Sequence, residues 1–152
     1  MAFWPEFPGR DGSRTPMPWI TGARHGGFTD AKTPWLPVPE AHRALAVDGQ
    51  EMEPASTLNV WRRCLALRRQ FPDLTQGNLA EVDEDGDVLA FSRGGRLVAV
   101  FNLSNAQADY VLPPGRYTPV ETPLPAGTAV AAADGVTLSL PPLGALLVIR
   151  EG

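Results

Sequence analysis

Two arginines and an aspartate lie close together in the segment GRDGSRTPMPW, residues 9–19. Arg10 and Arg14 flank Asp11, and the prolines that follow restrict the backbone to extended geometry. A guanidinium fork binds carboxylates, and planar apolar rings such as Trp19 suit the faces of sugar rings. These residue types indicate a rigid binding loop. The same residues also allow a loop that is held only by internal Arg–Asp pairs.

The other residues that could do chemistry do not form a metal-binding pattern. Cys64 is the only cysteine, so neither a disulfide within the chain nor a cysteine-rich zinc site is expected. His25 and His42 lack the spacing of metal ligands. The acidic run at residues 83–87 resembles the start of a calcium loop, but the later residues of that loop do not match. We therefore predict a solvated hairpin tip there, no metal site and no cofactor.

Residues 1–53 contain seven of the sixteen prolines and show no helical or strand period. A stretch of this length is too long for a simple connection inside a compact domain. Its tryptophans and phenylalanines argue against a flexible linker. We interpret it as an elaborate functional loop or as part of a larger domain.

Residues 54–70 are predicted to form a helix that ends at Phe71-Pro72. Leu58, Trp61 and Leu65 recur at helical spacing, and Cys64 extends the apolar side as a small core residue. Two arginines stand in the last turn, where cations suit the helix dipole.

The chain from residue 77 onward has the pattern of short strands separated by turns. Asp85-Gly86 and Gly94-Gly95 are hairpin turn signals. The Ala-rich segment 126–133 is expected to be a loop or a poor edge strand. The fold class is therefore mainly β, with a small antiparallel sandwich. Its expected strands are 78–82, 88–93, 96–102, 108–112, 117–121, 135–140 and 144–150.

Composition excludes several classes of protein. A formal net charge of −4 argues against a nucleic-acid binder, which is usually basic. No run of 18 apolar residues could cross a membrane. The first residues, MAFWPEFPGRDG, lack the regions of a signal peptide. We therefore expect a cytoplasmic protein without nucleic-acid or membrane partners.

Four sequence blocks resemble the C-terminal stretch of α-glucosidases of glycoside hydrolase family 13, which include the oligo-1,6-glucosidases and belong to the α-amylase superfamily. The RDGxRTPMxW signature is specific to this subgroup, and the blocks occur in the family's order. The resemblance covers about residues 3–79, and the sandwich matches in type and position. The blocks are FWPEFPGRDGSRTPMPW, GFT at 27–29, PWLPV at 34–38 and LNVWRRCLALRRQFPDLTQGN.

The resemblance implies a layout in which residues 1–53 are an active-site-type loop after the eighth strand of a (β/α)₈ barrel. Residues 54–76 would be the last barrel helix and a linker, and residues 77–152 an α-amylase C-terminal β-sandwich. Family members hold the terminal glucose with an arginine of this loop, paired with an aspartate from an early barrel loop. Arg10 is the first candidate for that substrate-binding role, and Arg14 is the second.

The resemblance places the family's catalytic carboxylates upstream of this stretch. Retaining glycosidases need two carboxyl groups about 5–5.5 Å apart, and Glu6, Asp11 and Asp30 lack the context of such a pair. We therefore expect no catalytic residue here.

The expected function is that of a C-terminal fragment of an exo-acting retaining α-glucosidase, inactive alone. It would meet its α-glucoside substrate through a catalytic barrel supplied in cis or by another chain. The alternatives are a stand-alone carbohydrate-binding module and a structural or interaction domain. Transferase, sucrose isomerase and trehalose synthase relatives are not separated from hydrolases by these residues.

Overall fold

The computed structural model describes residues 10–124, 127–132 and 135–151. The chain forms two compact units, Met1–Trp61 and Arg62–Gly152. The boundary between the two units falls inside the helix Thr57–Gln70, which the predicted division assigns to one segment, 54–76. The division into 1–53, 54–76 and 77–152 describes the role of each segment in a larger enzyme, and it stays a prediction.

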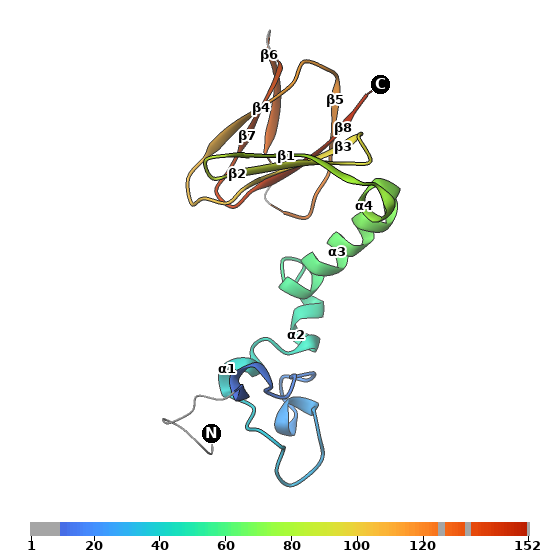
Figure 1. The fold of residues 1–152 in the computed structure, drawn as a ribbon. Coiled ribbons are helices and arrows are strands. Elements are labelled where there is room, and N and C mark those ends of the chain that lie inside the picture. The colour runs from blue at the N-terminus through green and yellow to red at the C-terminus, as the bar shows by residue number, and fades with distance from the viewer. Residues whose placement is uncertain (1–9, 125–126, 133–134, 152) are drawn as a thin grey trace. The chain divides into compact units, whose positions relative to one another are not determined.

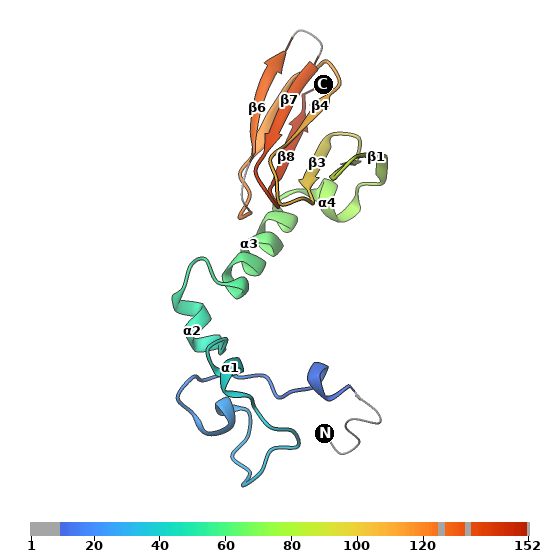
Figure 2. The same cartoon turned by 90° about the vertical axis from the view of Figure 1, so that its left-hand side faces the viewer.

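The second unit is a sandwich of two antiparallel sheets (Figures 1 and 2). One sheet has five strands in the order β1-β2-β3-β8-β5, and the other has three in the order β4-β7-β6. This arrangement confirms the mainly β fold class. The strands are β1 Leu79–Asp85, β2 Val88–Arg93, β3 Leu97–Asn102, β4 Ala108–Leu112, β5 Tyr117–Val120, β6 Thr128–Ala132, β7 Gly135–Leu140 and β8 Ala145–Arg150.

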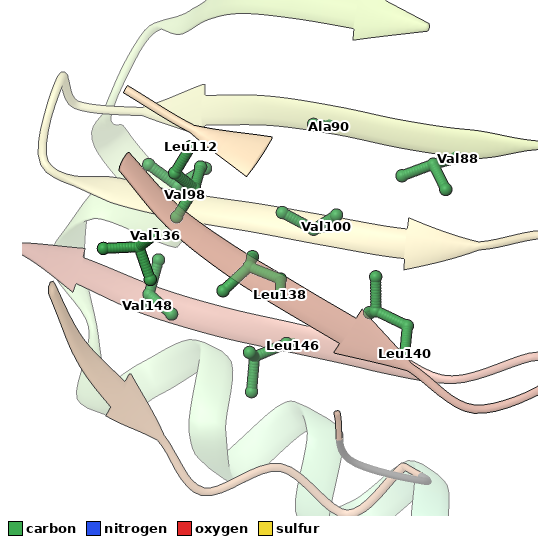
Figure 3. Packing of buried hydrophobic residues seen from close by; sticks show 10 residues of the cluster. All are labelled: Val88, Ala90, Val98, Val100, Leu112, Val136, Leu138, Leu140, Leu146 and Val148. Carbon is green, nitrogen blue, oxygen red and sulfur yellow. The ribbon is translucent and has the colours of Figure 1, made fainter. Parts of the chain in front are cut away.

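An apolar core fills the space between the two sheets. Figure 3 shows ten of its side chains, contributed by β2, β3 and β8 from one sheet and by β4 and β7 from the other. Val100, Leu138, Leu140 and Val148 are fully buried. Alternation places every second residue of a strand on the same face, and in β2 the buried residues alternate with partly exposed ones. The sequence pattern that predicted half-buried strands therefore has a direct structural counterpart.

Two helices lead into the sandwich, α3 (Thr57–Gln70) and α4 (Pro72–Gln76). A small second cluster of buried residues, Leu97, Ala99 and Leu147, lies on the outer face of the five-stranded sheet. Leu67 of α3, Phe71 between the two helices and Leu74 of α4 pack on it. Trp61 and Leu65 stay 65% and 42% exposed. Cys64 is half-buried rather than part of either core cluster.

Several elements differ from those predicted. The predicted helix 54–70 begins at Thr57, and Phe71-Pro72 ends it only to start α4. Pro suits the first helical position, because its missing N–H has no partner there in any helix. The region 1–53 contains two short helices, α1 (Glu40–Arg43) and α2 (Val47–Met52). Part of the Ala-rich segment forms β6 at the edge of the three-stranded sheet, which agrees with the edge-strand alternative of the prediction.

Helix α4 meets the β2–β3 turn in a close contact centred on Asp73. A Cβ on Gly77 would lie 2.5 Å from both the Asp73 carbonyl oxygen and the Gly94 nitrogen. A Cβ on Gly94 would collide with the Asp73 carboxylate. The Asp73 carboxylate also lies 3.6 Å from the guanidinium of Arg96. This contact fixes the end of the helical segment on the predicted Gly94-Gly95 turn.

Asn102, at the end of β3, is 2% exposed and its amide group joins both sheets. Its Nδ2 donates to the carbonyl oxygens of Ala106 at 2.7 Å, Pro141 at 2.9 Å and Leu140, the last residue of β7, at 3.3 Å. Its Oδ1 accepts from the N–H and the hydroxyl of Ser104. Asn102 therefore serves the fold, although Asn102-Leu103-Ser104 has the form of a glycosylation sequon.

Strand β1 forms an edge of the five-stranded sheet and is exposed along its whole length. Its register with β2 shifts between Ala80 and Asp83, and Glu81 in this bulge has a φ of +49°. Four of its seven residues are acidic. The turn after it contains Gly86 at a φ of +58°, as the predicted hairpin tip requires.

The first unit is built from short turns and helices. They include the 3₁₀ turns η1 (Asp11–Ser13) and η2 (Arg24–Gly27), besides α1 and α2. The start of α2 is fastened to the end of the 9–19 segment. The N–H of Asp48 donates to the Trp19 carbonyl at 3.1 Å, and that of Val47 donates to the Pro18 carbonyl at 3.2 Å.

The Asp48 carboxylate completes this junction. Oδ1 accepts from the hydroxyl of Thr21 at 2.8 Å, from the N–H of Thr21 at 3.0 Å and from the N–H of Gly49 at 2.8 Å. The hydroxyl bond from Thr21, followed by the backbone N–H bonds, lowers the pKa of Asp48 below its usual 3.8. The ionised carboxylate thus favours the folded arrangement.

We predict that Gly94→Ala destabilises the sandwich more than Gly95→Ala does. Both glycines have a positive φ, +60° and +71°, so alanine at either should cost about 1–2 kcal/mol of backbone strain. Only at Gly94 does the new methyl meet the Asp73 carboxylate, and moving that carboxylate away from Arg96 should add up to about 1 kcal/mol. Urea unfolding of both variants measures the difference, and equal losses would contradict the close contact.

We also predict that acid loosens the junction at Asp48. Because its pKa is lower in the folded chain, the carboxylate contributes stability above 3.8 and loses it as the pH falls through the lowered value. The amide signals of Thr21 and Gly49, followed by NMR during acid titration, should shift together in that range. Asp48→Asn should abolish this transition. A transition that persists in the variant would assign it to another group.

Candidate functional site

The two candidate arginines stand at the ends of η1. The carbonyl of Arg10 accepts from the N–H of Ser13 at 3.1 Å and from its hydroxyl at 2.9 Å. The N–H of Arg14 donates to the Asp11 carbonyl at 3.0 Å. The backbone around both arginines is therefore held in one tight turn, as the sequence predicted.

Both guanidinium groups are exposed. Within the described residues, neither Arg10 nor Arg14 makes a side-chain hydrogen bond or an ion pair, and Asp11 pairs with neither of them. Glu6, the other carboxylate considered at this loop, lies outside the described residues. Two forked donors thus remain available at the surface of a fixed loop.

A pocket of about 380 Å³ lies beside the turn. Asp11, Gly12 and Thr15 line one part of it, and the remaining lining comes from residues 36–42. Arg10 and Arg14 do not line it. The sequence prediction therefore found the loop but missed the residues it faces. They are Leu36, Pro37, Pro39 and His42, of which Leu36 and Pro37 belong to the PWLPV block.

A buried proline, Pro16, and a glycine, Gly26, hold the loop over residues 10–19 in place. Pro16 is one of the fully buried side chains. Gly26 in η2 accepts from the N–H groups of Trp19 and Ile20 at 2.6 and 3.0 Å, and its φ is +63°. A Cβ on Gly26 would lie 3.0 Å from Pro18 Cβ. The approach of η2 to the loop therefore depends on glycine at this position.

Large apolar side chains are exposed on the first unit, and two of them, Met17 and Trp19, belong to the loop over residues 10–19. Trp35 is 66% exposed, and Trp19 and Met17 are each 48% exposed. Aromatic rings in such positions bury apolar area against sugar rings or against further protein.

Asp11 is the only carboxylate among the lining residues of the pocket, whereas retaining glycoside hydrolysis uses two. Over the same described residues, no group of three or more His, Cys, Asp or Glu side chains could hold a metal ion. None of the helices in the described ranges is long and apolar enough to span a membrane.

Two family models match the chain and meet near the start of the sandwich. The model for the catalytic domain of α-amylase matches residues 2–77. The model for the C-terminal all-β domain of α-amylase matches residues 80–151. The loop with Arg10 and Arg14 thus falls in the catalytic-domain match, and the two sheets fall in the C-terminal match.

Curated relatives include a probable α-glucosidase of Rhizobium meliloti, 43% identical over 122 residues, which cover 78% of this chain and 22% of the relative. A probable oligo-1,6-glucosidase of Bacillus subtilis is 35% identical over 108 residues, covering 68% of this chain and 19% of that protein. The chain therefore spans about a fifth of the length of the curated relatives it matches.

Solved structures give the same result. The α-glucosyl transfer enzyme XgtA superposes with a TM-score of 0.82 at 38% identity, over 98% of this chain and 28% of that chain. An isomaltulose synthase variant from Erwinia rhapontici, solved with sucrose, gives a TM-score of 0.69 at 25% identity, over 95% and 26% of the two chains. With a catalytic-domain segment followed by an all-β domain, the chain belongs to the α-amylase family and corresponds to part of an α-glucosidase-like enzyme of glycoside hydrolase family 13.

Proposed function

We propose that the whole protein is an exo-acting α-glucosidase that hydrolyses terminal α-glucosidic bonds with retention, and that this chain supplies substrate-holding residues. The observation that carries the proposal is the pair of exposed guanidinium groups on a fixed loop. Arg10 and Arg14 have no side-chain partner among the described residues, so they are available to the hydroxyl groups of a terminal glucose.

The catalytic carboxylates come from the rest of the catalytic domain in this proposal. The pocket beside the loop offers one carboxylate, Asp11, and a retaining mechanism needs a nucleophile and an acid/base. The chain alone should therefore bind without catalysing. A carboxylate from the missing part would pair with Arg10 inside the closed site.

The partner we propose for the first unit is that missing part of the barrel, in cis or as another chain. Exposed Trp19, Trp35 and Met17 form apolar surface that a monomeric domain would normally cover. The relatives are several times longer than this chain, which fits a large absent domain. The presence of a single cysteine is consistent with a reducing compartment, and we propose a cytoplasmic location.

Glucosyl transfer is the second candidate activity. It is supported by the similarity to an α-glucosyl transfer enzyme at 38% identity over 98% of this chain. Transfer and hydrolysis differ in whether a sugar or water accepts the glucosyl group. Product analysis by chromatography, with maltose as both donor and acceptor, separates the two.

We predict that the isolated chain does not turn over p-nitrophenyl α-glucoside, because it lacks the carboxylate pair. The same chain joined to the preceding catalytic region of the Rhizobium meliloti relative should release nitrophenol. Activity of the isolated chain that co-purifies with it and disappears in Asp11→Asn would contradict the proposal. A stand-alone binding module would instead bind glucosides and leave the joined protein inactive.

In the joined protein, we predict that Arg10→Ala lowers kcat/KM by an amount equivalent to about 2–5 kcal/mol, as expected for truncating one member of a buried charge pair. Arg10→Lys should recover little, because an ammonium cannot reproduce the planar fork. Arg116→Ala, an exposed arginine of the sandwich, serves as the control. If Arg10→Ala lowers only the melting temperature, the substrate role passes to Arg14.

A further inference from the structure

The sandwich contains a pocket of about 260 Å³ that is lined by residues of the second unit alone. Strand β1 contributes Glu81 and Asp83, β4 contributes Tyr110, and β8 contributes Arg150. We call these four residues and the space they line the inter-sheet pocket, since β4 belongs to one sheet and β1 and β8 belong to the other.

The polar groups of the inter-sheet pocket are held in place by one another. Arg150 Nη2 lies 3.4 Å from Glu81 Oε2, and Tyr110 Oη donates to Asp83 Oδ2 at 2.8 Å. The Arg150 guanidinium also lies 6.0 Å from the centre of the Tyr117 ring. These pairs fix four polar side chains around one space.

The floor of the pocket is apolar. Ala90, Val98 and Leu112 line it and are at most 5% exposed. Apolar lining with a few convergent polar groups is the usual composition of a small-molecule site.

The bulge in β1 brings Glu81 to this pocket. Glu81 has a left-handed φ of +49°, a conformation unfavourable for a residue with a Cβ. The ladder shift between Ala80 and Asp83 accompanies it. Bulges that re-aim a side chain recur next to binding sites, and backbone strain is concentrated at functional positions.

The charges of the pocket disfavour an anion. Glu81 and Asp83 contribute two carboxylates against the single guanidinium of Arg150, which already faces Glu81. Burial, and then the hydrogen bond to Asp83, raise the pKa of Tyr110 to about 12, so its hydroxyl keeps its proton at neutral pH. Carboxylates accept and the guanidinium donates, while the single O–H of Tyr110 is already donated to Asp83 and its oxygen can still accept. A ligand with several neutral hydroxyl groups matches both.

We propose that the inter-sheet pocket binds one neutral sugar ring through its hydroxyl groups, as a binding site separate from the loop of Arg10. The carboxylates of Glu81 and Asp83 accept hydrogen bonds from the ring, and Arg150 donates to it. The apolar floor contacts its C–H groups. This proposal stands whether or not the whole protein is a glucosidase.

The test is an NMR titration of the isolated chain with methyl α-glucoside. Saturating shifts are expected at Glu81, Asp83, Tyr110 and Arg150. Shifts confined to residues 10–42, or no shift at the highest soluble concentration, would overturn the proposal. Methyl phosphate and tetramethylammonium serve as charged probes. If either binds the pocket more tightly than methyl α-glucoside does, the proposal of a neutral ligand is wrong.

Two variants localise the binding. Glu81→Gln removes an acceptor charge at an exposed residue and should weaken binding about tenfold, as expected for losing a hydrogen bond to a charged group. Tyr110→Phe should weaken it as well, with far-ultraviolet circular dichroism confirming that the sandwich stays folded. Arg116→Ala, at an exposed arginine that does not line the pocket, should leave the titration unchanged. Binding that responds to Arg10→Ala but not to Glu81→Gln would assign the sugar to the loop and refute the second site.

Discussion

The side-chain amide of Asn102 is the interaction on which the closure of the sandwich depends. Apolar packing brings the two sheets together but has no direction, whereas an amide with three carbonyl acceptors fixes one arrangement. One residue thus donates to three carbonyls at the end of the sandwich, where Pro141 also accepts from the N–H of Gly144 and Ala106 also accepts from the hydroxyl of Ser104. The hydrogen bond from Asn102 to Leu140 thereby holds the ends of β3 and β7 next to each other across the two sheets.

The strands were predictable because alternation and turn chemistry are local signals. The segments 88–93, 108–112 and 135–140 form strands with those bounds. For the Ala-rich segment the sequence left a loop and a poor edge strand open, because alanine has little strand preference, and the ladder with β7 makes it the edge strand β6. The helix ends before Phe71-Pro72 as predicted, whereas the second helix that begins at Pro72, and whose Leu74 packs on the sheet, was not predicted.

The loop of the site was visible in the sequence, and its surroundings were not. Arg10 and Arg14 stand out by type and spacing, and the turn they were expected to form is present. His42 lines the neighbouring pocket because α1 follows a run of prolines that bends the chain back toward Asp11. No hydrophobic periodicity in the sequence indicates that His42 and Asp11 line the same pocket. The inter-sheet pocket was missed for a similar reason, because Glu81 and Arg150 are 69 residues apart.

The two outer strands of the five-stranded sheet are β1 and β5, and both resist pairing with another chain. β1 presents four acidic residues and a bulge, so a second strand would meet like charges and a broken ladder. β5 contains Pro119, which removes a backbone donor from the strand. Growth of this sheet into fibrillar or domain-swapped aggregates is therefore disfavoured at both of its margins.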